Sequence, residues 1–250
     1  MMSSVSHYNQ VARNPPLQCR DMRLGHNVAK RMIIDRGLRV AGLPIESCEV
    51  MDLACGRGGD LNKIAGCKSY AGVDTAGDAL TELRRRAQEI GQAVEVYHCD
   101  ATVAPSRRAH LVLCNFAIHY FCDTRAHCAA LLDKVAETLL PSGAFCGTYE
   151  RHPTREFGVP HHAVVGDCVD AIEWRVPWDE VARMALARGL AVVYHVSISR
   201  LDGRCDPAIT GFIMQQAQAR YCGKTRQVSA IPGSLSPHRG SPPASCRPSS

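Results

Sequence analysis

Short apolar runs alternate with polar segments of helical character along most of this 250-residue chain. Two strands that are joined by a helix usually run parallel to each other in one sheet. This order therefore predicts a parallel sheet with helices on both faces. The last two runs have little sequence between them, so we expect an antiparallel hairpin at one edge. The predicted fold is α/β, with a doubly wound, mostly parallel, seven-stranded sheet. The expected strands are 49–54, 69–74, 94–98, 111–116, 144–149, 190–197 and 210–215.

Helices are expected between these strands, inside one folded domain that covers residues 1–222. They are predicted at 59–65, 78–90, 125–140 and 178–188, and Gly189 ends the last of them. Ser, Pro, Gly and Arg dominate the rest of the chain, which cannot bury enough apolar surface to offset its conformational entropy. Residues 223–250 are therefore predicted to form a disordered Ser/Pro/Arg-rich tail.

The composition argues against several classes of protein. No apolar stretch approaches the roughly 20 residues of a membrane-spanning helix, and the N-terminus lacks a secretory signal pattern. Four of the net +5 charges lie in the tail, so a polyanion site in the nearly neutral body must be local. Thirteen cysteines without a CxxC pair favour reduced thiols and an intracellular location. No metal site is expected, because His161, His162 and Cys168 lack a ligand spacing.

A glycine-rich turn follows the first expected strand, in the segment Asp52–Asp60. Such a turn lets a ligand approach the backbone, but Leu61 stands where the dinucleotide fingerprint needs its third glycine. The next two strands end near Asp74 and Asp100, placed to bind ribose hydroxyls and an adenine edge. An adenosine ligand without a pyrophosphate fits all three features, and S-adenosylmethionine is the obvious candidate.

Several motifs together resemble the mRNA cap guanine-N7 methyltransferase family. The resemblance runs from His7 to about Gln216, and the pairing of a CGxGGD loop with an FAxHY segment is its most specific part. It rests on residues 52–63 (DLACGRGGDLNK), 115–120 (NFAIHY), 147–149 (GTY), 172–178 (IEWRVPW), the triplet His7-Tyr8-Asn9, and the set Arg23, Asn27 and Lys30.

The resemblance implies a Rossmann-like methyltransferase domain over 1–222 and roles for individual residues. It implies cofactor contacts at Lys30, Asp52, Ala54, Gly56, Asp74, Asp100, Ala101, Asn115 and Tyr120. It implies cap contacts at His26, Asn27, Arg57, Lys63, Arg86, His119 and Glu173. The chain departs from the family at Ala54 for glycine, Asn115 for glutamine, His26 for asparagine and Gly211-Phe212 for a cap-contacting tyrosine.

The chemistry that this family performs needs no general base, because guanine N7 already carries a lone pair. It needs the methyl group and N7 in line and in contact, and we expect Glu173, His119 and Tyr120 to position the base. A carboxylate at Glu173 would face N1–H and N2–H₂ of guanine and stabilise the positive charge that develops on the ring. Arg57, Lys63 and the run Arg84–Arg86 are expected to meet the triphosphate.

The expected activity is methyl transfer from S-adenosylmethionine to N7 of the mRNA cap, in the nucleus, the cytoplasm or a viral factory. Its partners would be the capped 5′ end of mRNA and, as an open alternative, a separate triphosphatase–guanylyltransferase. Two other functions stay open from the sequence. One is a methyltransferase that acts on a small molecule or another nucleobase, and the other is a catalytically silent subunit of a capping complex.

Overall fold

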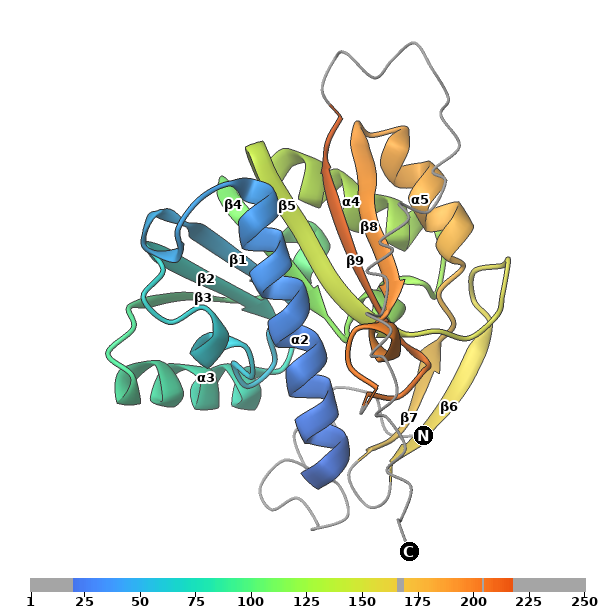
Figure 1. The fold of residues 1–250 in the computed structure, drawn as a ribbon, viewed down its shortest axis with the longest axis horizontal. Helices are drawn as coiled ribbons and strands as arrows, with labels where there is room; N and C mark the ends of the chain where they lie inside the picture. The colour runs from blue at the N-terminus through green and yellow to red at the C-terminus, as the bar shows by residue number, and fades with distance from the viewer. Residues whose placement is uncertain (1–19, 166–168, 204, 218–250) are drawn as a thin grey trace, which may run out of the picture. The chain divides into compact units, whose positions relative to one another are not determined.

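The computed structural model describes residues 20–165, 169–203 and 205–217 (Figure 1). The predicted tail at 223–250, the His7–Asn9 triplet and Cys168 lie outside the described residues. Seven strands form one sheet in the order β3-β2-β1-β4-β5-β9-β8, and only β9 runs antiparallel to its neighbours, β5 and β8. The predicted sheet and its antiparallel edge pair are thereby confirmed. The strands are β1 (Glu49–Leu53), β2 (Ser69–Asp74), β3 (Val94–His98), β4 (Ala109–Asn115), β5 (Leu139–Glu150), β8 (Leu190–Ser197) and β9 (Ile209–Gln216).

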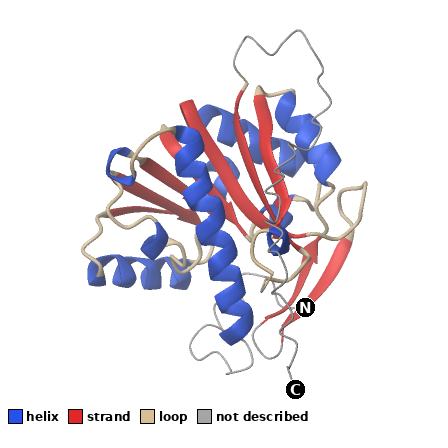
Figure 2. Cartoon of the chain, viewed as in Figure 1, coloured by secondary structure: helices blue, strands red, loops and turns tan. Residues whose placement is uncertain are grey.

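Helices cover both faces of this sheet, as the strand–helix alternation predicted (Figure 2). Apolar side chains of α2 (Arg20–Ala41) and α3 (Gly77–Glu89) join one core cluster with one set of strand residues. Those of α4 (Arg125–Thr138) and α5 (Trp178–Leu186) join a second cluster on the opposite face. Within the part of the chain that the structure describes, no helix has the length and apolar character to cross a bilayer.

Helix α2 is absent from the sequence-based prediction, and the helix expected at 59–65 does not form. Only the 3-10 turn Leu61–Lys63 occupies that segment, because the glycine loop before it uses left-handed backbone angles and Gly66 turns the chain again with φ 83°. Gly37 explains how closely α2 packs on the sheet. A Cβ at that position would lie 2.3 Å from the Cys146 sulfur on β5.

A second, two-stranded sheet was also not predicted. Strands β6 (Pro160–Val165) and β7 (Val169–Trp174) form an antiparallel hairpin in which His161 lies opposite Glu173. The hairpin is inserted between β5 and α5, and β7 contacts the 3-10 turn Ile118–Phe121 that follows β4. This contact brings Glu173 to the carboxyl end of the central strands. The other 3-10 turns are Ile45–Ser47, Ala101–Val103 and Ile198–Arg200.

Candidate functional site

The glycine loop after β1 is held open by the acid at the end of β2. Ala54, Gly56 and Gly58 have φ angles of 55°, 52° and 70°, in the left-handed region that favours glycine. The Asp74 carboxylate accepts hydrogen bonds from the backbone N–H groups of Gly56 (2.7 Å) and Ala76 (2.8 Å). Burial raises the pKa of Asp74. A carboxylate has about four lone-pair sites, so these two bonds leave capacity for two ribose hydroxyls.

Asp52 does not present a carboxylate to a ligand. It is 2% exposed within β1, and Oδ2 accepts a 2.9 Å hydrogen bond from the Tyr70 hydroxyl. Burial, and then the nearby charge of Asp60, raises the pKa of Asp52 to about 8. The direct cofactor contact expected for Asp52 is therefore not supported by the geometry. The residue stabilises β1 and β2 beneath the loop.

Asp60, at the end of the loop, is the centre of a buried ionic network that the sequence did not identify. Its carboxylate lies 3.3 Å from Lys30 Nζ and 3.2 Å from Lys63 Nζ. Asn115 on β4 donates a 3.1 Å hydrogen bond to the same carboxylate. Burial alone would raise the pKa of Asp60, but the charges of Lys30 and Lys63 outweigh it and lower that pKa. The network thus joins α2, the loop and β4, and it includes two predicted cofactor residues, Lys30 and Asn115.

The Lys63 side chain is largely enclosed, with 7% of it exposed. Its ammonium donates to Asn27 Oδ1 (2.9 Å) and to the Gly59 carbonyl (2.6 Å), in addition to its ion pair with Asp60. Burial lowers the pKa of Lys63. The structure brings the predicted cap residues Asn27 and Lys63 together, but it uses the ammonium for contacts within the chain. A contact between Lys63 and a triphosphate stays a prediction. To make it, the ammonium would have to replace one of these three contacts with a phosphate oxygen.

An aromatic pair borders the network. The rings of His26 on α2 and Phe116 after β4 stack with centroids 4.3 Å apart, and Lys30 Nζ lies 5.9 Å from the Phe116 centroid. Burial, and then the charge of Lys30, lowers the pKa of His26 to about 4, so the ring is neutral at pH 7. Phe116 has φ 51°, a strained value for an aromatic residue. Such strain is concentrated at functional sites, and Phe116 was not among the predicted site residues, although it lies in the FAxHY motif.

The three predicted positioning residues converge at one carboxylate. Glu173 Oε1 accepts a 3.3 Å hydrogen bond from the Tyr120 hydroxyl and lies 3.4 Å from His119 Nε2. The rings of His119 and Tyr120 are in contact, with centroids 4.1 Å apart. Burial would raise the pKa of Glu173, but His119 and Tyr120 lower it overall, so the carboxylate is ionised at neutral pH. The arrangement fixes a single anionic acceptor between β7 and the turn after β4.

Asp100 and Ala101 lie beside Asp74 at the same edge of the sheet, where the Cys99 N–H donates to the Asp74 carbonyl. The Asp100 carboxylate accepts hydrogen bonds from the backbone N–H and hydroxyl of Thr102 (2.8 and 2.6 Å) and so caps the 3-10 turn Ala101–Val103. Its second oxygen lies 3.6 Å from His127 Nε2. The expected adenine contacts of Asp100 and Ala101 stay predictions.

The expected phosphate contacts are only partly brought together. Arg57 is half-buried within the glycine loop, as expected. Arg86, however, lies in the last turn of α3 and pairs with Glu82 at 2.7 Å. Because an α-helix rises about 1.5 Å per residue, Arg86 is far along the helix from the end that meets the sheet's ligand edge. The helix begins at the ligand edge as expected, and a contact between Arg86 and a triphosphate stays a prediction.

Neither Gly211 nor Phe212 presents a side chain that could contact a bound base. A Cβ on Gly211 would lie 2.2 Å from Ile33 Cδ1, so no tyrosine fits there while α2 is in place. Phe212 is fully buried on the other face of the sheet, where its ring meets those of Phe145 and Trp178. The family's tyrosine thus has no equivalent side chain at these two residues.

Comparison with known proteins identifies the family. Residues 3–154, more than half of the chain, match the model of the mRNA (guanine-N(7))-methyltransferase domain. The chain belongs to the mRNA (guanine-N7)-methyltransferase family. The matched segment includes the glycine loop, Asp60 and the His119-Tyr120 pair, but it ends before the hairpin that carries Glu173.

Curated relatives called mRNA cap guanine-N(7) methyltransferase share moderate identity with this member of the family. The Drosophila melanogaster protein is 31% identical over 124 residues, with 41% of this chain and 29% of that protein covered. The Caenorhabditis elegans protein is 28% identical over 166 residues, with 58% and 44% covered. The Saccharomyces cerevisiae protein is 27% identical over 174 residues, with 60% and 36% covered. The chain spans less than half the length of these three relatives.

Solved structures place this guanine-N7 methyltransferase family member in a wider fold group. The SAH-bound magnesium protoporphyrin IX methyltransferase of Synechocystis superposes with a TM-score of 0.63 at 10% identity, covering 85% of this chain and 94% of that one. A methyltransferase from Clostridium acetobutylicum, described as S-adenosylmethionine-dependent, gives a TM-score of 0.60 at 13% identity, covering 76% and 92%. At such low identity these matches show the shared Rossmann-like fold alone.

Proposed function

We propose that this chain transfers a methyl group from S-adenosylmethionine to N7 of the guanosine cap of mRNA. The observation that carries the proposal is the convergence of His119 and Tyr120 on the ionised carboxylate of Glu173, at the same edge of the sheet as the glycine loop. Such an edge is where ligands bind in open α/β sheets. The glycine loop can bind a nucleoside donor, and the Glu173 carboxylate can bind a second ring system.

The donor side of the site is assigned to the loop and the network around Asp60. The half-buried Asp74 accepts from the Gly56 N–H of the loop and from the Ala76 N–H before α3, and it retains lone pairs for ribose hydroxyls. Lys30 provides a cation for the carboxylate end of the donor, while Asp60 and Asn115 hold Lys30 and the loop in place. S-adenosylmethionine, when bound, supplies the electrophilic methyl group.

The acceptor side is assigned to Glu173. Tyr120 and His119 fix its Oε1 and keep the group ionised, so its remaining lone pairs can accept from N1–H and N2–H₂ of guanine. As positive charge develops on the guanine ring, this preorganised anion stabilises it. No proton leaves N7, which explains why the trio can work as a positioning group without a general base.

Methyl transfer from radiolabelled S-adenosylmethionine to cap-ended RNA tests the proposal. Glu173→Gln is expected to lower kcat by roughly 10²-fold, in line with the loss of one preorganised electrostatic contact, and to leave S-adenosylhomocysteine binding intact. Glu180→Gln is the matched control, because that carboxylate on α5 pairs only with Arg125 and Arg183 among the described residues. Absence of label at N7 with the wild-type chain overturns the proposed function.

A second candidate is a methyltransferase with a different acceptor. It is favoured by the contacts of the Lys63 ammonium within the chain, by the pairing of Arg86 with Glu82, and by the absence of a tyrosine at Gly211-Phe212. Label in free nucleobases or small metabolites, with none in capped RNA, supports this candidate.

The proposed partners are the capped 5′ end of mRNA and a separate triphosphatase–guanylyltransferase, and the proposed location is the nucleus or the cytoplasm.

A further inference from the structure

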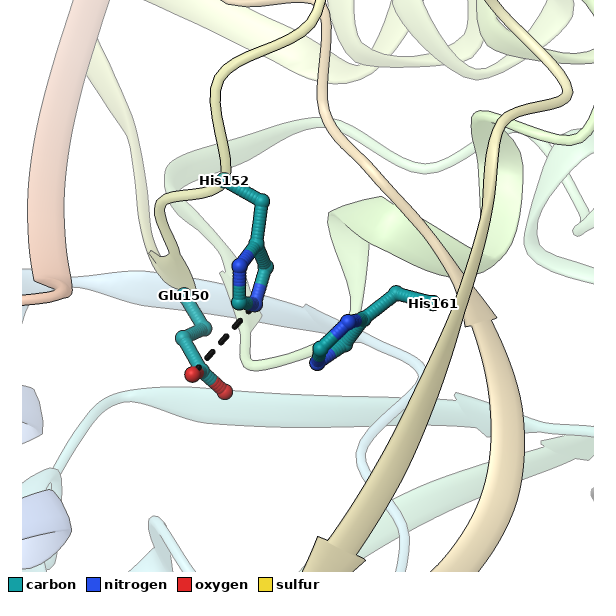
Figure 3. Close-up of side chains that lie close together, drawn as sticks. All are labelled: Glu150, His152 and His161. Carbon is teal, nitrogen blue, oxygen red and sulfur yellow. Dashed lines mark ion pairs between the residues drawn. The ribbon is translucent and has the colours of Figure 1, made fainter.

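We propose that Glu150, His152 and His161 form a binding site for a divalent transition-metal ion of the zinc class. Figure 3 shows the three side chains pointing toward one another from two separate segments. Glu150 ends β5 and His152 follows it, whereas His161 comes from β6. One ligand atom from each residue lies within 4.8 Å of the other two.

The donor set and its spacing suit such an ion. Two imidazoles and one carboxylate are a known zinc ligand set, with metal–ligand bonds of about 2.0 Å. In a tetrahedron of that size, neighbouring ligand atoms are about 3.3 Å apart. His152 Nε2 and Glu150 Oε1 are already 3.3 Å apart, and the rings of His152 and His161 have centroids 3.8 Å apart. The pair His152–Glu150 thus already has the spacing of two ligands, and His161 lies within 4.8 Å of both.

A second observation concerns the surroundings of the His152 nitrogen. His152 Nε2 is shielded from solvent and makes no hydrogen bond within the part of the chain that the structure describes. Its near polar neighbour is Oε1 of Glu150 at 3.3 Å, and without a hydrogen bond this contact offsets the desolvation cost of the nitrogen only in part. A metal ion between this nitrogen and Oε1 of Glu150 would remove that cost and join the two groups.

An ion in this cluster would connect the β6–β7 hairpin to the main sheet. His161 lies directly opposite Glu173 in the β6–β7 register, so the ion would fasten the hairpin to the end of β5. The Glu150 side chain is 49% exposed, which leaves a route for the ion and a fourth position for water. The sequence predicted no metal site, because the ligands lie on a strand end and an unpredicted hairpin and lack a short-spaced motif.

Calorimetric titration of the full chain with zinc, after removal of bound metal with a chelator, tests the site without cap or cofactor. We expect one ion per chain, and cobalt in its place should show visible d–d bands without near-ultraviolet thiolate absorption. His152→Ala and His161→Ala should weaken binding by more than the roughly 10–100-fold that loss of a second-shell partner costs. His162→Ala is the matched control, because this neighbour on β6 lies opposite Ile172 and outside the cluster.

Three results would overturn the site: no zinc bound by the wild-type chain, cobalt spectra dominated by thiolate ligands, or unchanged affinity in folded His152→Ala and His161→Ala variants. If either alanine variant fails to fold by circular dichroism, Glu150→Gln, which keeps the side-chain volume, replaces it in the same titration. Methyl transfer is not measured in this experiment, so its result tests the metal site independently of the proposed function.

Discussion

Replacing Asp60 with asparagine tests whether the ionic network supports the loop. The amide would keep the volume of the side chain but leave Lys30 and Lys63 without their shared anion. Both ammonium-bearing side chains are enclosed, at 18% and 7% exposure. Removal of one partner from a buried ion pair costs about 3–5 kcal/mol. Because Lys63 retains Asn27 and Gly59 as acceptors, we expect the lower end, about 3 kcal/mol.

Urea unfolding and thermal melting measure this loss. For a domain of this size, 1 kcal/mol shifts Tm by about 2–4 °C, so Asp60→Asn should lower Tm by roughly 6–12 °C. Asp133→Asn is the matched control, because it also removes an ion-paired aspartate, bonded to Arg188 at 2.7 Å, but at 64% exposure. An exposed pair is worth about 0–1 kcal/mol. Binding of S-adenosylhomocysteine should weaken only in Asp60→Asn, since only that variant displaces Lys30.

The pH dependence supplies an independent check. The lysines hold the pKa of Asp60 below its ordinary value of 3.8, so the folded state binds this proton less readily than the unfolded chain. The stability from Asp60 is therefore present above pH 3.8 and lost as the pH falls through the lower folded value. Asp60→Asn should flatten that part of the profile. Equal losses of stability in Asp60→Asn and Asp133→Asn would refute the role of burial in this reasoning.

The other predictions concern the loop, the sheet and the aromatic pair. Asp74→Ala should abolish S-adenosylhomocysteine binding in calorimetry, because the Gly56 N–H of the loop loses its acceptor and the ribose loses the proposed one; unchanged affinity would contradict the assignment. Gly147→Ala should destabilise the chain by about 3 kcal/mol or more in urea unfolding, because its Cβ would lie 2.3 Å from the Cys114 carbonyl oxygen, whereas Gly203→Ala, with open space around it, should change little. The pKa of His26 is lowered from 6.5 to about 4, so its share of stability falls as the pH drops from 6.5 toward 4. His26→Asn should remove that share from the pH profile, and an unchanged slope would count against it.

The sequence predicted the sheet well because its evidence is local. The central strands β1, β2 and β4 are short, almost wholly buried apolar runs, which stand out from the polar helices between them. The acids Asp74 and Asp100 follow directly from this topology, because the carboxyl ends of neighbouring parallel strands meet at one edge. The backbone bond from Cys99 to Asp74 shows that they do meet there.

The elements that the sequence missed depend on tertiary packing. Helix α2 has charged residues between its buried positions Ala29, Ile33 and Ile34, and Gly37 lies in its interior, where glycine usually disfavours a helix. Its close approach to Cys146 on β5 justifies that glycine, and no local pattern reveals it. The β6–β7 hairpin likewise packs against the turn after β4, a contact that no local pattern in the sequence reveals.

The candidate site residues divide in the same way, into those that sheet topology brings together and those that tertiary packing brings together. The strand ends carry the residues proposed for the donor side, and the sequence could assign these in part because sheet topology alone brings them together. The acceptor side depends on Glu173, which reaches His119 and Tyr120 only through the hairpin. Asp60 likewise gathers Lys30 from α2 and Asn115 from β4, residues far apart in the chain. A substitution that loosens α2 or the hairpin without touching the sheet should therefore impair ligand binding before it unfolds the domain.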